Sequence, residues 1–255
     1  MSVEVHMFPC LSDNYGFLVH EPTAGVTASI DTPEAEPINA ALAQKGWTLT
    51  HIFNTHHHFD HAGANEALKA RWGCTVVGAA NDAARIPVID VRVGDGDVFD
   101  FGATQVEVLE VPGHTTGHIA YYFAAEGIAF VGDTLFALGC GRLFEGSPAQ
   151  MWNSLQKLMA LPDDTTVYCA HEYTQANAAF ALTVEPENRD LVARAEEITR
   201  LRSAGKPTVP TTIGLEKATN PFLRPHSNAL QRQVGLSGAA PVEVFAETRR
   251  RKDNF

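Results

Sequence analysis

The chain has 255 residues, of which 45% are hydrophobic and 19% are charged, and its formal net charge is −11. This composition is typical of a globular protein with a large core and excludes a mainly disordered or fibrous chain. The charge is unevenly distributed. Residues 1–170 carry 20 acidic and 7 basic side chains, whereas residues 171–255 carry 10 acidic and 12 basic ones. Because a nucleic-acid interface requires a basic surface, we expect no nucleic-acid partner.

The sequence also bears on location. It contains no run of about 18 apolar residues, so we expect no membrane-spanning segment. Its first residues lack a basic start followed by an apolar stretch, so we expect no secretory signal. The four cysteines are scattered and form no Cys-x-x-Cys pair; they are Cys10, Cys74, Cys140 and Cys169. Scattered cysteines of this kind predict reduced thiols in a cytoplasmic protein.

Short apolar segments separated by turns predict strands in the first two-thirds of the chain. The expected strands are residues 3–8, 15–20, 26–30, 49–53, 75–77, 104–111, 119–123, 128–131 and 166–170. Helices are expected over residues 34–45 and 62–72, since a glycine suited to a helix C-terminus follows each. A further helix is expected to begin at Ser147-Pro148 and to end before Pro162.

From about residue 173 the pattern changes to helix. Residues 188–204 place apolar side chains on one face, residues 207–225 look irregular, and a last helix is expected to begin near Pro241. The sequence therefore predicts a β-rich α+β or α/β domain followed by a small helical domain. We place the boundary so that the domains comprise residues 1–172 and 173–255.

The basic residues near the end of the last expected helix fall on two faces. Phe245, Arg249 and Lys252 are four and three residues apart, so they share one face of a helix. We expect Phe245 to pack towards the protein, with the two cations beside it. Arg250 and Arg251 lie off this face and are expected to be more solvated.

The segment that follows the strand at 49–53 concentrates side chains that bind metal ions, namely His56, His58, Asp60 and His61. His56 and His58 are two residues apart at a strand end, so their imidazole rings point the same way. His57 is expected to point to the opposite face. A lone histidine is usually structural, but four nitrogen and oxygen donors within six residues favour a metal site.

Three further donors come directly after apolar strands, namely His114, Asp133 and His171. If those strands share a sheet, the donors converge at one edge. Seven donors exceed what one tetrahedral ion uses, so they predict two ions. One ion is expected to bind His56, His58 and His114. The other is expected to bind Asp60, His61 and His171. Asp133 would bridge them, because a carboxylate has two oxygens.

Histidine and carboxylate ligands accept zinc, iron or manganese, and zinc is the divalent ion we expect. The chain has no Gly-x-Ser-x-Gly nucleophile elbow, so a hydroxide that bridges the two metal ions is the expected nucleophile. The catalytic candidates are Asp60, which would orient the hydroxide while binding metal, and Asp133. His118 either supports a ligand or is a structural histidine.

The motif of residues 55–63, Thr-His-His-His-Phe-Asp-His-Ala-Gly, together with His114, Asp133 and His171, resembles the metallo-β-lactamase superfamily. This resemblance implies a four-layer αββα sandwich over roughly residues 3–172. Finer features resemble the hydroxyacylglutathione hydrolases, also called glyoxalase II. They include Gly132-Asp133-Thr134-Leu135-Phe136, Gly139-Cys140-Gly141-Arg142, His171-Glu172-Tyr173-Thr174, Asn220-Pro221-Phe222 and Arg249-Arg250-Arg251-Lys252-Asp253.

The second resemblance covers nearly the whole chain. It implies hydrolysis of S-D-lactoylglutathione to D-lactate and glutathione, a step in methylglyoxal detoxification. It also implies that Arg249 and Lys252 hold the glycine carboxylate of the substrate, and that Tyr173 and Arg142 line the tripeptide site. Some members have Lys and Tyr in place of Arg142 and Phe144, so a hydroxyl contact is lost here. The expected partner is this small molecule, and the chain is expected to act as a monomer.

Two other functions are compatible with the motif. A glutathione persulfide dioxygenase of the same superfamily would use a single iron, but the helical tail with Arg249 and Lys252 favours the hydrolase. A non-catalytic metal-binding module usually closes its coordination with cysteines, whereas these donors leave positions for water. A β-lactamase fits the tail less well, and the acidic first segment disfavours an RNA-processing nuclease.

Overall fold

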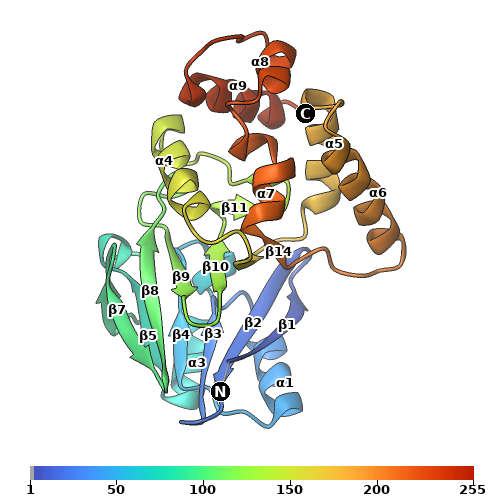
Figure 1. Cartoon of the computed structure of the whole chain (residues 1–255). Helices are drawn as coiled ribbons and strands as arrows, with labels where there is room; N and C mark the ends of the chain where they lie inside the picture. Colours follow the sequence, from blue (N-terminus) through green and yellow to red (C-terminus); the bar gives the residue numbers. More distant parts are fainter. Residues whose placement is uncertain (1–2) are drawn as a thin grey trace. The chain divides into compact units, whose positions relative to one another are not determined.

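The structure is a computed structural model that describes residues 3–255 (Figure 1). These residues divide into two compact units. Unit 1 contains the described residues up to Glu110 together with Thr116–Gly132, and unit 2 contains Val111–Thr115 and Asp133–Phe255. Within residues 3–255, none of the helices combines the length and the apolar character needed to span a membrane.

Unit 1 contains a six-stranded sheet in the order β1-β2-β3-β4-β5-β6. Its strands are β1 (Glu4–Cys10), β2 (Asn14–Glu21), β3 (Val26–Ile30), β4 (His51–Phe53), β5 (Thr75–Ala79) and β6 (Val91–Val93). The first three strands pair antiparallel, and β3 to β6 pair parallel. Parallel neighbours need a crossover connection. Helix α1 (Ala35–Lys45) supplies the one before β4, and α3 (Asn65–Trp72) the one before β5.

A second set of strands in unit 1 forms an antiparallel meander of β7 (Val98–Phe101), β8 (Thr104–Glu110), β9 (Ile119–Phe123) and β10 (Ile128–Gly132). Its side chains pack against the six-stranded sheet through buried aromatic rings. The ring centroids of Phe53 and Tyr121 lie 5.2 Å apart, and those of Phe17 and Phe130 lie 5.6 Å apart. The other face of the six-stranded sheet packs on α1 and α3. Unit 1 is therefore a helix–sheet–sheet sandwich.

Unit 2 is mainly helical. Its helices are α4 (Pro148–Met159), α5 (Thr174–Val184), α6 (Arg189–Ser203), α7 (Ile213–Thr219), α8 (Asn228–Val234) and α9 (Pro241–Asp253). It also contains a small hairpin of β11 (Leu135–Phe136) and β12 (Gly139–Cys140), and the pair β13 (Thr166–Cys169) and β14 (Thr211–Thr212).

The predicted helices form where local signals specify them. At α4, the Ser147 side chain accepts from the N–H of Gln150, whose own side chain accepts from the Ser147 N–H. At α6, Asn188 caps the first turn, and the apolar face packs on α5 and Leu138. Prediction was wrong where signals were weak. The strands β6, β7, β11, β12 and β14 were not predicted; each has four residues or fewer, too few for an alternating pattern to stand out. Helix α7 lies within the stretch expected to be irregular. The helix expected over residues 62–72 begins later, as α3, and a separate short helix, α2 (Phe59–Ala62), precedes it.

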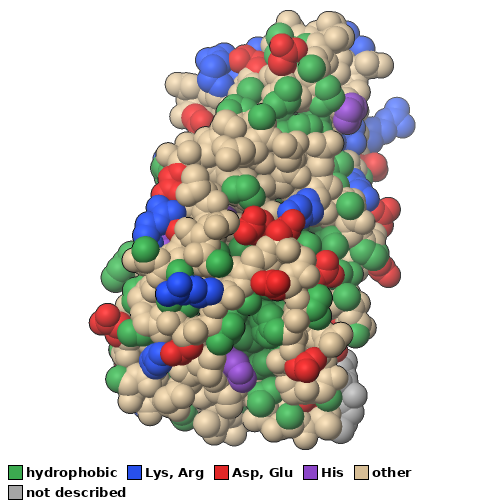
Figure 2. All heavy atoms as spheres, turned by 90° about the vertical axis from the view of Figure 1, so that its left-hand side faces the viewer, with side chains coloured by type: hydrophobic (Ala, Val, Ile, Leu, Met, Phe, Trp, Pro, Cys, Tyr) green, Lys and Arg blue, Asp and Glu red, His purple; other side chains and the backbone are tan. Residues whose placement is uncertain are grey.

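Figure 2 shows one face of the molecule with its side chains coloured by type. On the face shown in Figure 2, acidic, basic and hydrophobic side chains are mixed, and the described residues visible there form no continuous basic patch.

Candidate active site

Unit 1 carries four of the predicted donors directly after β4. His56 and His61 are fully buried, and the ligand atoms of these two rings lie within 4.8 Å of one another. The same limit holds for His56 with His58 and for Asp60 with His61. The structure therefore brings these four donors into one group within the unit, which we call the donor loop (His56, His58, Asp60 and His61).

Asp31 supports the donor loop, and sequence reasoning missed it. Its Oδ2 lies 2.8 Å from Nδ1 of His61, so this nitrogen donates, and Nε2 faces Asp60 Oδ2 at 3.5 Å. Thr55 donates to both oxygens of Asp31, from its backbone N–H and its hydroxyl. Asp31 has a φ of 58°, which a non-glycine residue rarely adopts. Its position directly after a strand, like that of Asp133, is the signal that could have identified it.

Two histidines next to the donor loop, His57 and His118, lie in different environments. His57 Nδ1 is 2.8 Å from Asp82 Oδ2, and Asp82 also accepts from Nε of Arg85. The ring of His57 is thus held by Asp82, in agreement with the alternation along the chain. His118 is fully buried, and its ring stacks on His56 with centroids 4.6 Å apart. His118 therefore packs directly beside a predicted ligand.

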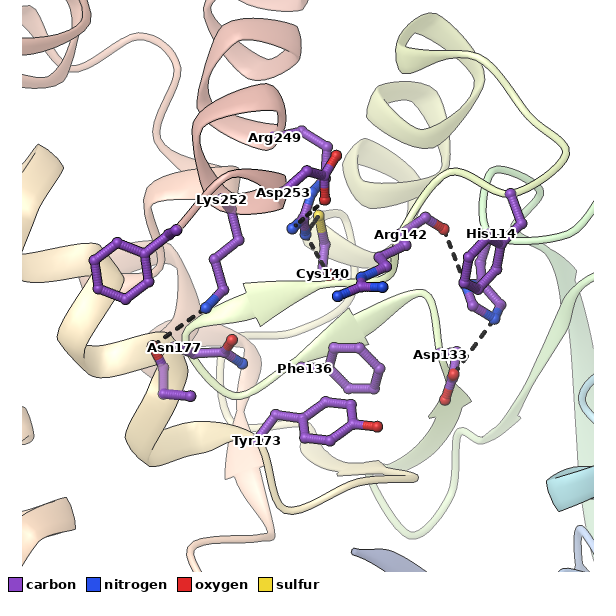
Figure 3. Close-up of a pocket in the computed structure, with 13 residues that line it drawn as sticks. His114, Asp133, Phe136, Cys140, Arg142, Tyr173, Asn177, Arg249, Lys252 and Asp253 are labelled. Carbon is purple, nitrogen blue, oxygen red and sulfur yellow. Dashed lines mark hydrogen bonds and ion pairs between the residues drawn. The ribbon is translucent and has the colours of Figure 1, made fainter.

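Unit 2 carries the other three predicted donors, all buried. Two of them, His114 and Asp133, are labelled in Figure 3. Asp133 Oδ2 lies 3.4 Å from His114 Nε2, and Oδ1 lies 3.3 Å from His171 Nε2. Each oxygen of Asp133 thus faces a different histidine. The carbonyl of Arg142 is 2.9 Å from Nδ1 of His114. Since a carbonyl only accepts, Nδ1 carries the proton and Nε2 is presented towards Asp133.

The β11–β12 hairpin positions this group. A Cβ on Gly141 would lie 2.0 Å from the carbonyl oxygen of Asp133, so only glycine allows the chain to pass so closely. The side-chain amide of Asn220 donates to the carbonyls of Phe136 and Gly139 and holds the hairpin from the other side. These contacts account for the glycine-rich segment before Arg142 and for the distant asparagine.

A cavity of about 490 Å³ in unit 2 extends from His114 and Asp133 to α9 (Figure 3). All four predicted substrate contacts line it, namely Arg142, Tyr173, Arg249 and Lys252. Sequence reasoning missed other lining residues, among them Asn177 on α5, Cys140 and Asp253. Nothing in the spacing along the chain distinguishes them, because their side chains meet only after the helices pack. The ring of Tyr173 stacks on His171 with an interplanar angle of 3°.

The part of the cavity near α9 is rich in positive charge, and we call Arg142, Arg249 and Lys252 its cation end. Burial, and then the charges of Arg249 and Arg142, lower the pKa of Lys252. Cations held this closely attract an anion. Burial raises the pKa of the Cys140 thiol to about 11, so it is protonated near neutral pH and unsuited to act as a nucleophile.

Arg250 and Arg251 lie outside the cavity. Both pair with Glu247, and Arg251 also donates to the carbonyls of Gln233 and Val234. Phe245 is fully buried. As predicted, Arg249 and Lys252 face the cavity and Arg250 and Arg251 do not. Arg250 is exposed, but Arg251 is half-buried, as Lys252 is, so the expectation that Arg251 is more solvated was wrong.

Two family models match the chain. The model described as "Metallo-beta-lactamase superfamily" matches residues 24–171, and the model described as "Hydroxyacylglutathione hydrolase C-terminus" matches residues 172–255. A protein named hydroxyacylglutathione hydrolase from Maricaulis maris (strain MCS10) is 57% identical over 251 residues, which are 98% of each chain.

Solved structures are similar at lower identity. The crystal structure of ETHE1 from Myxococcus xanthus is 29% identical with a TM-score of 0.69, and the match covers 98% of this chain and 90% of that one. A structure of TTHA1623 in a di-iron-bound form is 25% identical with a TM-score of 0.62. That match covers 86% of this chain and all of the other.

Proposed function

The chain belongs to the hydroxyacylglutathione hydrolases of the metallo-β-lactamase superfamily, and from this premise we propose that it hydrolyses S-D-lactoylglutathione to D-lactate and glutathione. The family matches confirm the expected α+β fold, a metallo-β-lactamase sandwich followed by a helical domain, and the expected class of enzyme, a thioester hydrolase. One observation in particular supports the substrate. Within unit 2, the cavity that holds His114 and Asp133 also holds the cation end, which suits the carboxylates of a glutathione thioester. Its volume is within the range usual for small-molecule sites.

The fold and the donor set support the use of divalent metal ions. We propose that two ions bind, most readily zinc, with iron or manganese as alternatives. The donors are imidazole nitrogens and carboxylate oxygens. Two of the rings are oriented through their Nδ1 atoms, that of His61 by Asp31 and that of His114 by the carbonyl of Arg142. We assign one ion to His56, His58 and His114. We assign the other to Asp60, His61 and His171. Asp133 would bind both.

When bound, the ions lower the pKa of coordinated water, so that hydroxide is available near neutral pH. Asp60 would orient the nucleophile, and it is itself held by Asn14, whose amide donates to Oδ2 at 3.1 Å. Arg249 and Lys252 would hold the glycine carboxylate. Tyr173 and Arg142 would orient the tripeptide, so that the thioester carbonyl lies near the donors at the other end of the cavity.

The decisive test combines metal analysis of the purified enzyme with thioester cleavage, followed as loss of absorbance. We expect close to two transition-metal ions per chain and rapid, metal-dependent cleavage of S-D-lactoylglutathione. The likeness to ETHE1 supports a second candidate, a mono-iron glutathione persulfide dioxygenase. This support is weaker than the support for the hydrolase, because the relative named hydroxyacylglutathione hydrolase is 57% identical and ETHE1 is 29% identical. Oxygen uptake with glutathione persulfide, without thioester cleavage, would favour that candidate.

We further propose that residues 1–172 form the catalytic domain and residues 173–255 the domain that binds the glutathione part of the substrate. The boundary between the two family models, at residues 171 and 172, supports this division. The compact units divide the chain differently, since residues 133–172 pack within unit 2. We also propose a cytoplasmic monomer, and the four buried free cysteines support a reducing compartment. Light scattering after gel filtration tests the oligomeric state.

A further inference from the structure

An acidic residue lies at the cation end of the cavity. Asp253 Oδ1 is 2.8 Å from Nη2 of Arg249, four residues earlier on α9, and both residues line the cavity (Figure 3). The Asp253 side chain is 43% exposed, whereas that of Arg249 is 6% exposed. A carboxylate at this place opposes the entry of a substrate carboxylate, because like charges repel. Its position therefore needs an explanation.

The helix does not explain it. Asp253 is the last residue of α9, where the negative end of the helix dipole disfavours a carboxylate. The three residues before it, Arg250, Arg251 and Lys252, are cations that suit this end. What Asp253 contacts instead is the guanidinium of Arg249.

Asp253 is also not needed to orient Arg249. Nη1 of Arg249 donates to the carbonyl of Cys140 at 2.9 Å, and the guanidinium lies over the ring of Phe222, 5.0 Å from its centroid. These two contacts hold the plane of the guanidinium from the rest of unit 2. What they do not supply is negative charge. A cation removed from water is costly unless an anion compensates it.

We propose that Asp253 is a built-in counter-anion, which neutralises Arg249 in the empty cavity and competes with the glycine carboxylate of the substrate for it. This inference rests on the proposed function. The half-exposed Asp253 side chain can turn towards solvent when a ligand carboxylate approaches, whereas Arg249 stays in place. Asp253 thereby sets the affinity for the glutathione part of the ligand and favours release of glutathione after hydrolysis.

The substitution Asp253→Asn tests this, because it removes the charge and keeps the size. S-methylglutathione is the probe, since it carries the carboxylates but no thioester. We expect the metal-loaded variant to bind it about threefold to tenfold more tightly than the wild type in calorimetry, the range for one removed like charge. KM for the thioester should fall in parallel, and the gain should shrink at high salt. Glu247→Gln is the matched control, because Glu247 lies on the same helix and pairs with Arg250 and Arg251 outside the cavity; its affinity should match that of the wild type.

Thermal unfolding gives a second readout. Without ligand, the Asn variant should unfold at a lower temperature than the wild type, and saturating S-methylglutathione should abolish or reverse that difference. Unchanged or weaker binding by the Asn variant would overturn the inference, and weaker binding would instead make Asp253 a positioning residue for Arg249. Asp253→Ala serves if the Asn variant does not fold. If the wild type itself neither binds S-methylglutathione nor cleaves the thioester, the proposed function fails and this inference falls with it.

Discussion

The donor loop of unit 1 and the cation end of the cavity in unit 2 are built in opposite ways. The donor loop takes its ligands from six consecutive residues at the end of one strand, and Asp31 fixes the ring of His61. The cation end collects Arg142, Arg249 and Lys252 from two segments about a hundred residues apart, and its charges repel one another. The first arrangement suits a tightly held ion, and the second suits a ligand that must enter and leave.

This difference predicts which measured quantities a substitution changes in each region. Changes among the donors should lower metal content and turnover together, because turnover depends on the bound ions. Changes at the cation end should raise KM and leave metal content intact, since they remove ground-state binding.

Asp133 is expected to give the largest effect, because it is the only proposed ligand assigned to both ions. Asp133→Ala should lower the rate of thioester hydrolysis by at least about 100-fold and release metal, since the loss of a bridging ligand exceeds that of a supporting one. Metal analysis and steady-state kinetics measure the two outcomes. A variant that keeps two ions and most of its activity would show that Asp133 is not the bridge.

Substitutions of the adjacent residues His57 and His58 should differ sharply in their effect on metal binding. His58→Ala should reduce metal occupancy and activity together by about 10-fold or more, as expected for a lost ligand. His57→Ala should keep occupancy near normal and cost about 1 kcal/mol of stability, because it removes the hydrogen bond to Asp82. Equal losses of metal from the two variants would contradict the alternation of the side chains.

At the cation end, Arg249→Ala combined with Lys252→Ala should raise KM about 10- to 100-fold and change kcat little, the range for two lost charge-assisted contacts. The effect should shrink at high salt, and metal content should stay constant. Arg250→Ala with Arg251→Ala is the matched control, because these side chains pair with Glu247 outside the cavity. A larger rise in KM in the control would refute the assignment of the anion site.

Asp31 tests whether the donor loop depends on its support. Asp31→Asn should weaken metal affinity about 10-fold, measured by competition with a chelator, because it removes the charge that orients His61. Asp82→Asn is the comparison, since Asp82 holds the bystander His57 in the same kind of contact. Equal losses of metal from the two variants would show that the contact of Asp31 with His61 does not increase metal affinity.

The smallest effect concerns pH. The pKa of Lys252 is lowered by burial and by Arg249 and Arg142, so its amine loses its proton at a lower pH than an ordinary lysine does. Because only the protonated amine attracts a carboxylate, KM should rise by a few-fold as the pH increases through this lowered pKa. Lys252→Arg should remove the rise, since arginine stays charged. A rise that persists in the arginine variant must come from another group.

Local sequence determines several of the elements that build the site. The strand that precedes the donor loop, the capped helix α4 and the spacing of His56 and His58 depend on side chains that are neighbours along the chain, where periods of two and 3.6 residues hold. The two faces of α9 follow from the same geometry. For the donor loop, the structure brings together the four side chains that the local spacing predicted to lie close.

Other features were decided only when the chain folded. Asp31 contacts His61, which lies 30 positions further along the chain. The proposed role of Asp253 depends on Arg249, which the carbonyl of Cys140 and the ring of Phe222 hold in place beside it. Helix α7 forms in a stretch whose prolines indicate irregular structure, and the strained backbone of Asp31 persists because Thr55 and His61 hold it. Periodicity along the chain specifies which face of an element is apolar, but not which element will cover it. Burial, charge compensation and the shape of a cavity arise from contacts between distant segments, so only the tertiary structure could determine them.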